Sequence, residues 1–498
     1  MITSTNPLRS FRAGKKTFIA ALALTGATLG AMESAQAAAT IIINNKNAAG
    51  VGFNDSTPAM PVGGNPGTTL GEQRLFAFTY AANLWGATLT SSQPIVIDAQ
   101  MTSLACTATS ATLGSAGATS TFRNFANAPF TNTLYSYALA NKLAGAYLGT
   151  ANAAQISANF NSDLGMNANC LPGRTWYLGL DGQHGTNVDF IPVLLHEMGH
   201  GLGFQTFTNG SSGAQSGGVP SIWDRFLTDA STGKKWVDMT NNERKASAIS
   251  RESLVWDGPN VNAAVPTVLT FGLASATFSG PAAGAMAGMV RVGEADFGPA
   301  LGTSPIFAEV MPVIEQTAGA GEACEPFNAN NAKAVNGKIA FINLGGGPAT
   351  APCTVATKTK NAQNAGAIAV LIGDTVADGG LQPIPLGGWD KTVTIPTVRM
   401  FLTDATKLKT SLLKRSRTGS GIWASLGRDG GARYAGADAL GRALLFAPNP
   451  FVSGSSVSHY DRSMFRNQLM EPNISNDLGT SVIPPQDMTL PLFKDIGW

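Results

Sequence analysis

Charged residues are scarce in this chain, and their two signs nearly cancel. Lys, Arg, Asp and Glu together make up 13% of the 498 residues, and the formal net charge is +2. This is about half the charged fraction of an average globular protein, and it excludes a disordered polyelectrolyte. So small a net charge creates no field that would attract nucleic acid or an anionic membrane surface. We therefore expect neither of them as a partner.

Several catalytic signatures are also missing. No G-x-S-x-G nucleophile elbow occurs, and the glycine run at residues 345–347 is not followed by the Lys-Ser/Thr pair of a P-loop. Glycine itself is abundant, with 57 residues, which predicts a globular protein rich in loops. A chain of this length exceeds one ordinary hydrophobic core, so we expect two or three domains.

Long hydrophobic runs are absent except near the N-terminus. Basic residues between positions 9 and 16 precede an uncharged stretch at 17–32, which is followed by the small-x-small sequence Ala35-Gln36-Ala37. This order is typical of a secretory signal peptide. A helix of that length spans ~24 Å, less than the ~30 Å hydrocarbon core that an uncleaved anchor would have to cross. We predict a signal peptide at residues 1–37, a mature chain without a membrane anchor, and a secreted or extracytoplasmic location.

The few cysteines fit an oxidising compartment. There are four, and no C-x-x-C spacing of a structural zinc site occurs among them. Three pairings are possible. Because the chain changes character between the inner two cysteines, we favour Cys106 with Cys170 and Cys324 with Cys353, and free thiols are the alternative.

The hydrophobic pattern predicts an α+β fold and divides the chain into three segments that differ in their expected secondary structure. Up to about residue 284, strand-like pieces at 95–99 and 176–180 alternate with a helical stripe at 134–148, and a helix begins near Asn187 or Asp189. Residues 285–415 show short α/β alternation, with strands at 338–342 and 367–372, a helix at 355–365 and a strand starting at 394. From 416 to 498 the composition returns to Gly, Ser and Asn.

The middle segment resembles a protease-associated (PA) domain. The resemblance is carried by NGKIAFINLGG, by APCTVATKTKNAQNAGAIAVLI with its cysteine, and by TIPTVRMF. It implies an α/β domain inserted at 285–415 that positions protein substrates or shapes access to a cleft. A role as a plain spacer remains equally open.

The strongest local signal is the motif His196-Glu197-Met198-Gly199-His200. On a helix, residues four apart lie on the same face, so both imidazoles can bind one metal ion. Glu197 lies beside them, where it can take a proton from a zinc-activated water. Pro192 is compatible with this helix if the helix starts near Asp189, because first-turn amides have no intrahelical partner.

Catalytic zinc usually needs a third protein ligand. In the metzincin pattern H-E-x-x-H-x-x-G-x-x-H that ligand would fall at position 206, which is Thr206 here. The remaining histidines are His184, in a turn, and His459, far downstream. Glu243 is a rival of the kind found in thermolysin-like enzymes, although its polar surroundings favour a solvated helix face. The lone carboxylate Asp224 is expected to have a structural role.

The chain resembles leishmanolysin and its bacterial relatives, metzincins whose third histidine follows a long insertion. The matching stretches are HEMGHGLGF at 196–204, SHYD at 458–461, NQLMEP at 467–472 and the terminal LPLFKDIGW. The resemblance implies a metzincin-like catalytic domain formed by residues 38–284 and 416–498. It also implies that His196, His200 and His459 bind one catalytic Zn²⁺ and that Met470 is the Met-turn residue beneath the metal.

Together these features predict a secreted zinc endopeptidase that hydrolyses peptide bonds of proteins, with Glu197 as general base and then general acid. Tyr460 is a candidate for assisting the oxyanion, although a packing role is at least as plausible. The alternative function is a secreted binding or adhesion protein that uses the same scaffold without turnover.

Overall fold

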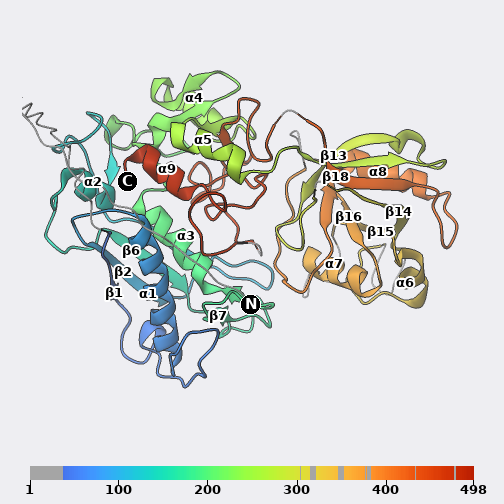
Figure 1. Cartoon of the computed structure of the whole chain (residues 1–498), viewed down its shortest axis with the longest axis horizontal. Helices are drawn as coiled ribbons and strands as arrows, with labels where there is room; N and C mark the ends of the chain where they lie inside the picture. The colour runs from blue at the N-terminus through green and yellow to red at the C-terminus, as the bar shows by residue number, and fades with distance from the viewer. Residues whose placement is uncertain are drawn as a thin grey trace, which may run out of the picture. The chain divides into compact units, whose positions relative to one another are not determined.

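The computed structural model describes residues 38–302, 304–314, 321–345, 353–375, 377, 383–431, 433–475 and 478–498. The predicted signal peptide at 1–37 lies outside the described residues. The fold mixes helices with several β-sheets and a closed β-barrel (Figure 1). No helix in the described part of the chain has the length and hydrophobicity needed to cross a membrane.

A four-stranded sheet underlies the first part of the chain. Its order is β1 (Ile41–Asn45), β2 (Ile95–Thr102), β6 (Ile156–Asn161) and β3 (Gly114–Ala118). The first three strands run parallel, and β3 pairs antiparallel with β6 and is the last strand in this order. The predicted strand at 95–99 is confirmed and is longer than expected, because its alternate residues stay buried as far as Met101.

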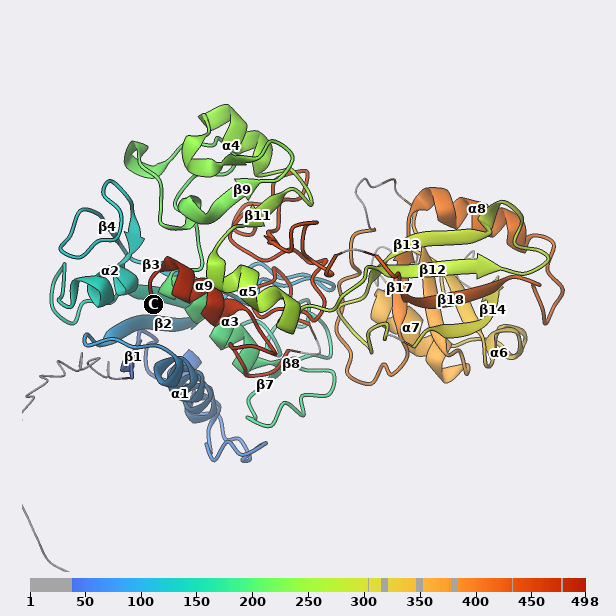
Figure 2. The same ribbon diagram turned by 45° about the horizontal axis from the view of Figure 1, so that its top comes forward.

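Two long helices pack on this sheet, α1 (Leu70–Thr88) and α3 (Phe190–Leu202), as Figures 1 and 2 show. A capping box starts α1: the Thr69 hydroxyl accepts from the Glu72 amide, and the Glu72 carboxylate accepts from the Thr69 amide. The indole of Trp85 on α1 donates to the carbonyl of Leu195 on α3 at 3.1 Å. This contact fixes α1 against the helix that carries the H-E-x-x-H motif.

The predicted helix at 134–148 is shorter in the structure. It appears as α2 (Tyr137–Ala144), because residues 135–136 form a strand and Gly145, at φ 66°, ends the helix. The predicted strand at 176–180 is likewise reduced to its first two residues. The short paired strands here are β4 (Thr121–Phe122) with β5 (Tyr135–Ser136), and β7 (Trp176–Tyr177) with β8 (Val188–Asp189).

A second sheet and three helices complete the part outside the barrel. The sheet order is β10 (Lys234–Lys235), β9 (Leu227–Asp229), β11 (Leu254–Trp256) and β19 (Ala443–Leu444). The helices are α4 (Asn241–Ser247), α5 (Pro259–Val268) and α9 (Thr489–Ile496). Single-turn 3₁₀ helices lie at Gly52–Asn54, Ser216–Gly218, Trp223–Phe226 and Trp236–Asp238, and a further one, Gly284–Met286, belongs to the barrel. Helix α9 packs on α5, and the indole of Trp498 donates to the carbonyl of Leu202, so the C-terminus closes onto α3 (Figure 2).

The inserted segment folds as a closed barrel with its own hydrophobic cores. The strand order is β12 (Ala274–Ser279), β13 (Gly288–Glu294), β17 (Thr397–Met400), β16 (Ala369–Gly373), β15 (Ile339–Asn343), β14 (Ile306–Pro312) and β18 (Trp423–Arg428). Its helices are α6 (Ala329–Val335), α7 (Val355–Asn364) and α8 (Leu402–Leu412). Because β12 and β18 pair with each other to close the barrel, its strands extend beyond the predicted limits of 285 and 415 on both sides.

One predicted disulfide is present and the other is not. Cys106 and Cys170 are bonded. Cys324 and Cys353 are free thiols, so that part of the prediction is wrong for this structure. A hydrogen bond between the two thiols takes the place of the covalent bond, and burial raises the pKa of Cys353 to about 12. The ammonium group of Lys358 lies 3.8 Å from the sulfur of Cys324.

Removal of the Cys106–Cys170 disulfide should lower the free energy of unfolding. The bridge spans 64 residues of sequence, and in the loop-entropy model a loop of that size is worth about 4 kcal/mol. We expect the double variant Cys106→Ala/Cys170→Ala to show this loss in urea unfolding. The matched variant Cys324→Ala/Cys353→Ala removes two free thiols, and a comparable loss there would contradict the assignment.

Candidate metal centre

Helix α3 carries His196, Glu197 and His200 of the H-E-x-x-H motif. Asp189 caps the helix by accepting from the Ile191 amide at 3.2 Å, and Pro192 lies in the first turn, as predicted. Every residue of α3 is buried. The two imidazoles therefore leave a helix that is packed on all sides, which limits their freedom.

The end of α3 supplies an acceptor for its second histidine. Gly203 adopts φ 133°, a value that side-chain-bearing residues rarely adopt, and turns the chain back on itself. The next carbonyl, that of Phe204, then lies 2.8 Å from Nδ1 of His200.

His459 reaches the same point from far along the chain. Its Nε2 lies 3.1 Å from Nε2 of His200 and 3.2 Å from Nε2 of His196, and the last two atoms are 3.1 Å apart. All three residues are buried. Backbone hydrogen bonds hold the segment, since the carbonyl of His459 accepts from the Phe446 amide and the carbonyl of Met470 accepts from the Tyr460 amide, both at 2.9 Å.

The tautomers of the three rings follow from their other nitrogens. Nδ1 of His196 lies 2.7 Å from the Leu469 carbonyl, and Nδ1 of His459 lies 2.8 Å from the Ser455 carbonyl. A carbonyl only accepts, so each Nδ1 carries the proton and each Nε2 presents a lone pair. Three lone pairs that face one another repel unless a cation lies between them. Tetrahedral zinc, with Zn–N bonds of about 2.0–2.1 Å, separates its nitrogen ligands by about 3.3–3.4 Å, so the cluster fits this ion.

The charge state of the rings agrees with metal binding. Burial lowers the pKa of His196 to about 3 and that of His200 to about 4, and it lowers the pKa of His459 well below its usual value. All three imidazoles are therefore neutral at neutral pH, the form in which histidine binds metals.

Glu197 lies between α3 and strand β3. Its carboxylate accepts from the Ala116 amide, and burial raises its pKa to about 8. A Cβ atom on Gly114 would lie 2.7–2.9 Å from the Glu197 side chain, so only glycine leaves room for the carboxylate at this point of the strand.

Met470 packs directly against α3, where a Cβ on Gly199 would lie 2.7 Å from its sulfur. The turn that carries it also contains Leu469, the acceptor for His196. The amide of Leu469 donates to the buried carboxylate of Asp487 at 2.7 Å. Sequence reasoning missed Asp487, because nothing in QDMT distinguishes this carboxylate from a surface one.

Asp224 has the structural role that its sequence context favoured. It is fully buried and accepts from the hydroxyls of Thr206 and Thr208, both at 2.6 Å. The amide of Thr206 in turn donates to the hydroxyl of Ser458, next to His459, at 3.2 Å. Thr206, where the compact metzincin pattern places a ligand, thus supports the segment that carries the distant histidine.

The other candidates lie elsewhere. His184 hydrogen-bonds the Asn187 carbonyl and contacts the ring of Trp389. Glu243 is the capping-box residue of α4 and pairs with Lys234 at 2.5 Å. The hydroxyl of Tyr460 donates to the Met488 carbonyl at 3.1 Å, which is the packing role and not the oxyanion role.

Comparisons with known proteins identify only part of the chain. No curated protein matches it. Among solved structures, the zinc aminopeptidase BSAP of Bacillus subtilis is 18% identical over 34% of this chain and 36% of its own, with a TM-score of 0.21. An aminopeptidase of Aneurinibacillus sp. strain AM-1 is 14% identical over 45% of each chain, with a TM-score of 0.22. A peptidase M28 precursor of Shewanella amazonensis is 14% identical over 41% of this chain and 44% of its own, with a TM-score of 0.23.

This chain thus spans less than half of each of these structures, and TM-scores this low carry no argument about fold or activity. The family comparison is specific: residues 307–408 match the model of the PA domain. The resemblance to this domain that the sequence suggested is confirmed, and the match falls within the barrel.

Proposed function

We propose that this protein is a zinc-dependent endopeptidase of the metzincin type with an inserted PA domain. The observation that carries the proposal is the convergence of three neutral imidazole lone pairs, from His196, His200 and His459, beside the carboxylate of Glu197. One catalytic Zn²⁺ held by these nitrogens would supply a Lewis acid that polarises a peptide carbonyl and lowers the pKa of water from about 15.7 toward about 7.

The chain's own residues carry out the remaining steps. Glu197 takes a proton from the attacking water and delivers it to the leaving amine, as general base and then general acid. The raised pKa of this buried group favours its protonated form, and a bound cation would restore the carboxylate. Leu469, Phe204 and Ser455 hold the imidazoles through their carbonyls.

Strand β3 supports the choice of polypeptides as substrates. It is the last strand of its sheet in the described part of the chain, and it lies against the turn of α3 that carries Glu197. An extended peptide can add to such an edge through main-chain hydrogen bonds, which brings an internal peptide bond to the site. We further propose a secreted or extracytoplasmic location, in keeping with the Cys106–Cys170 disulfide.

Digestion of casein, an unfolded protein, tests the proposal. We expect mass spectrometry to find internal fragments, 1,10-phenanthroline to abolish their formation and added Zn²⁺ to restore it. Release of only single N-terminal residues would contradict endopeptidase action. Binding of casein without any cleavage would favour the alternative, a secreted binding or adhesion protein.

Gly114→Ala should lower kcat on casein by about 100-fold without loss of zinc. The new methyl group displaces the Glu197 carboxylate, and a misplacement of about 1 Å in a catalytic group costs about that much. Gly117→Ala is the matched control, since a Cβ on Gly117 would contact only the side-chain oxygen of Gln205, at 3.4 Å. Equal activity of the two variants in a steady-state assay would contradict the assigned place of Glu197.

A further inference from the structure

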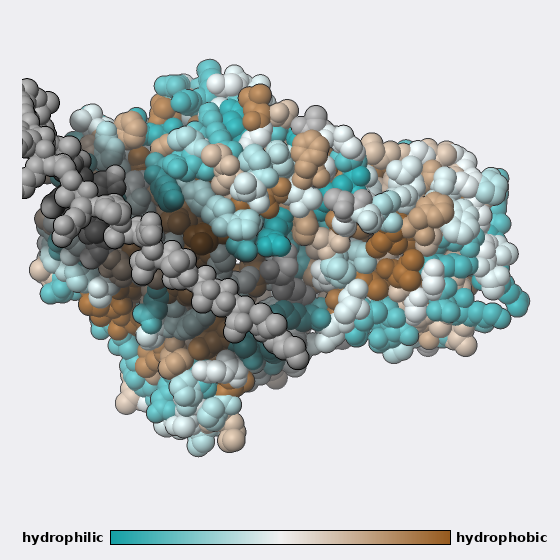
Figure 3. Space-filling view, in the orientation of Figure 1, coloured by the Kyte–Doolittle hydropathy of each residue, from teal (hydrophilic) through white to brown (hydrophobic). Residues whose placement is uncertain are grey.

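The barrel carries a hollow of about 420 Å³ that contains no residue of the candidate metal centre. It lies where the ends of β14 and β15 meet the C-terminal end of α8. Its apolar lining includes Val313, Ile314, Phe341, Leu412 and Leu413. Figure 3 shows hydrophobic side chains gathered among hydrophilic ones on the face of the barrel that is turned toward the viewer.

Two residues of the apolar lining are exposed to solvent. Leu413 is 83% exposed and Ile314 is 44% exposed. When a ligand covers a large aliphatic side chain that is exposed beside a hollow, the complex is stabilised by about 25 cal/mol for each Å² of apolar surface removed from water. The volume of the hollow accommodates one or two bulky side chains of a ligand.

The remaining lining is cationic. Lys409, Arg415 and Arg417 border the hollow, and no carboxylate does so among the described residues. Within the same part of the chain, none of the three forms an ion pair, and Arg415 donates only to the carbonyl of its neighbour Ser416. Three unpaired cations around an apolar hollow are complementary to a ligand that is apolar in one part and anionic in another.

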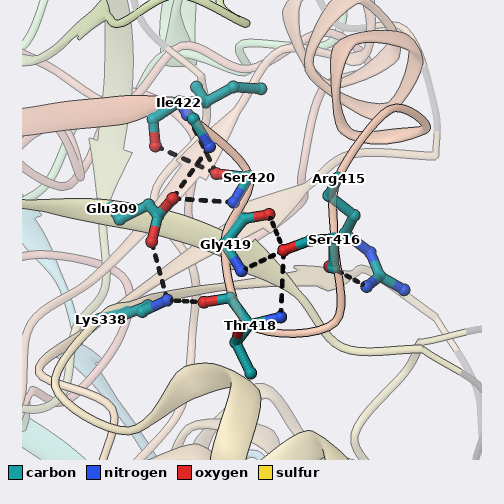
Figure 4. A network of polar contacts seen from close by, with 9 residues as sticks. Glu309, Lys338, Arg415, Ser416, Thr418, Gly419, Ser420 and Ile422 are labelled. Carbon is teal, nitrogen blue, oxygen red and sulfur yellow. Dashed lines mark hydrogen bonds and ion pairs between the residues drawn. The ribbon is translucent and has the colours of Figure 1, made fainter.

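A partly buried network holds the loop that carries Arg415 and Arg417. The Glu309 carboxylate accepts from the amides of Ser420 and Gly421 at 2.8 and 2.9 Å and pairs with Lys338 at 2.7 Å. Lys338 also donates to the Thr418 carbonyl. Figure 4 shows this network, with the Arg415 guanidinium on the outer side of the loop, away from Glu309.

The Ser416 hydroxyl reinforces the same loop by accepting from the amide of Gly419 at 2.9 Å. The backbone that carries Arg415 and Arg417 is therefore ordered before any ligand binds, which reduces the entropy cost of binding.

We propose that this hollow binds an extended peptide segment that has a bulky apolar side chain next to acidic residues. The apolar side chain enters the hollow, and the carboxylates pair with Lys409, Arg415 and Arg417. The choice of a peptide as the occupant rests on the proposed peptidase function. The site then selects protein substrates through residues that are separate from those of the metal centre.

Binding of short labelled peptides to the full-length Glu197→Gln protein, followed by fluorescence anisotropy, tests this inference without turnover. The probe has the sequence GGFEDEGG. One comparison peptide has lysines in place of the acidic residues, and another has glycine in place of phenylalanine. We expect the probe to bind at least about tenfold more tightly than either comparison peptide.

Arg415→Gln/Arg417→Gln should weaken binding of the probe at least about tenfold. The matched control is Lys414→Gln, which removes a cation from the same segment but outside the hollow. Leu413→Ser should weaken binding without any change of charge, so it reports separately on the apolar contact. Three outcomes would overturn the inference. The first is unchanged affinity of the double variant for the probe, and the second is equal affinity of the protein for the lysine peptide. The third is displacement of the probe by dodecanoate at the same concentration as by unlabelled peptide.

Failure of the inference is separable from failure of the proposed function. For this comparison the double variant is also made with Glu197 intact. If it cleaves casein as the wild type does and its probe binding is unchanged, the hollow is not a substrate site but the peptidase assignment stands. If the probe binds as expected but the wild-type protein does not cleave casein, the binding site stands and the peptidase assignment fails.

Discussion

Glu197→Gln should lower kcat by about 10²–10⁴-fold while zinc remains bound. The substitution keeps the size of the side chain and leaves His196, His200 and His459 unchanged, so the ligand set survives. An amide accepts no proton from the attacking water and has none to give to the leaving amine. The expected loss is therefore that of general acid–base catalysis.

Two measurements check this expectation. They are kcat on casein, and the zinc content of the protein by inductively coupled plasma mass spectrometry. Glu243→Gln is the matched control, because Glu243 undergoes the same chemical change in an exposed capping box. Full activity of Glu197→Gln, or an equal loss in Glu243→Gln, would show that another group moves the proton.

His459→Ala should release zinc, whereas His184→Ala should retain it. Loss of a group that only hydrogen-bonds a metal ligand lowers metal affinity by up to about 100-fold. Removal of one of the three nitrogen donors themselves should lower it further. His184 contacts the Asn187 carbonyl and the Trp389 ring, and neither group belongs to the cluster. We therefore expect activity to fall with zinc affinity in the first variant only.

Competition with a chromophoric chelator measures the zinc affinity of both variants. Circular dichroism compared with the wild type checks that each is folded. The reverse pattern, with zinc lost from His184→Ala and retained by His459→Ala, would move the third ligand to the turn before α3 and refute the proposed centre.

Local features of the site could be predicted from sequence because short-range rules govern them. The spacing of His196 and His200 defines one face of a helix wherever that helix lies. The start of this helix near Asp189 and the tolerated Pro192 follow from the unpaired amides of a first helical turn. The strands and helix expected between 338 and 372 are present for the same reason, since their hydrophobic periods are clear. The ligand roles themselves stay predictions.

Where the sequence expectations failed, long-range packing overrode the local pattern. The helix at 134–148 was shortened because the two residues before it pair with β4. The barrel limits were misplaced because β12 and β18 pair across a separation of about 150 residues, which no local pattern reports. The pair Cys324 and Cys353 was correctly expected to be close, but proximity alone does not determine whether two thiols are oxidised.

The sequence by itself determined the H-E-x-x-H helix, the PA-like segment and the short set of histidines that could complete a metal site. Only the tertiary structure brought Nε2 of His459 to 3.1 Å from that of His200 across 259 residues, and only it supplied the carbonyls that orient all three rings. The physical reason is one of range. Helix geometry depends on neighbours three or four residues apart, whereas a buried polar cluster forms only when distant segments satisfy one another's hydrogen bonds.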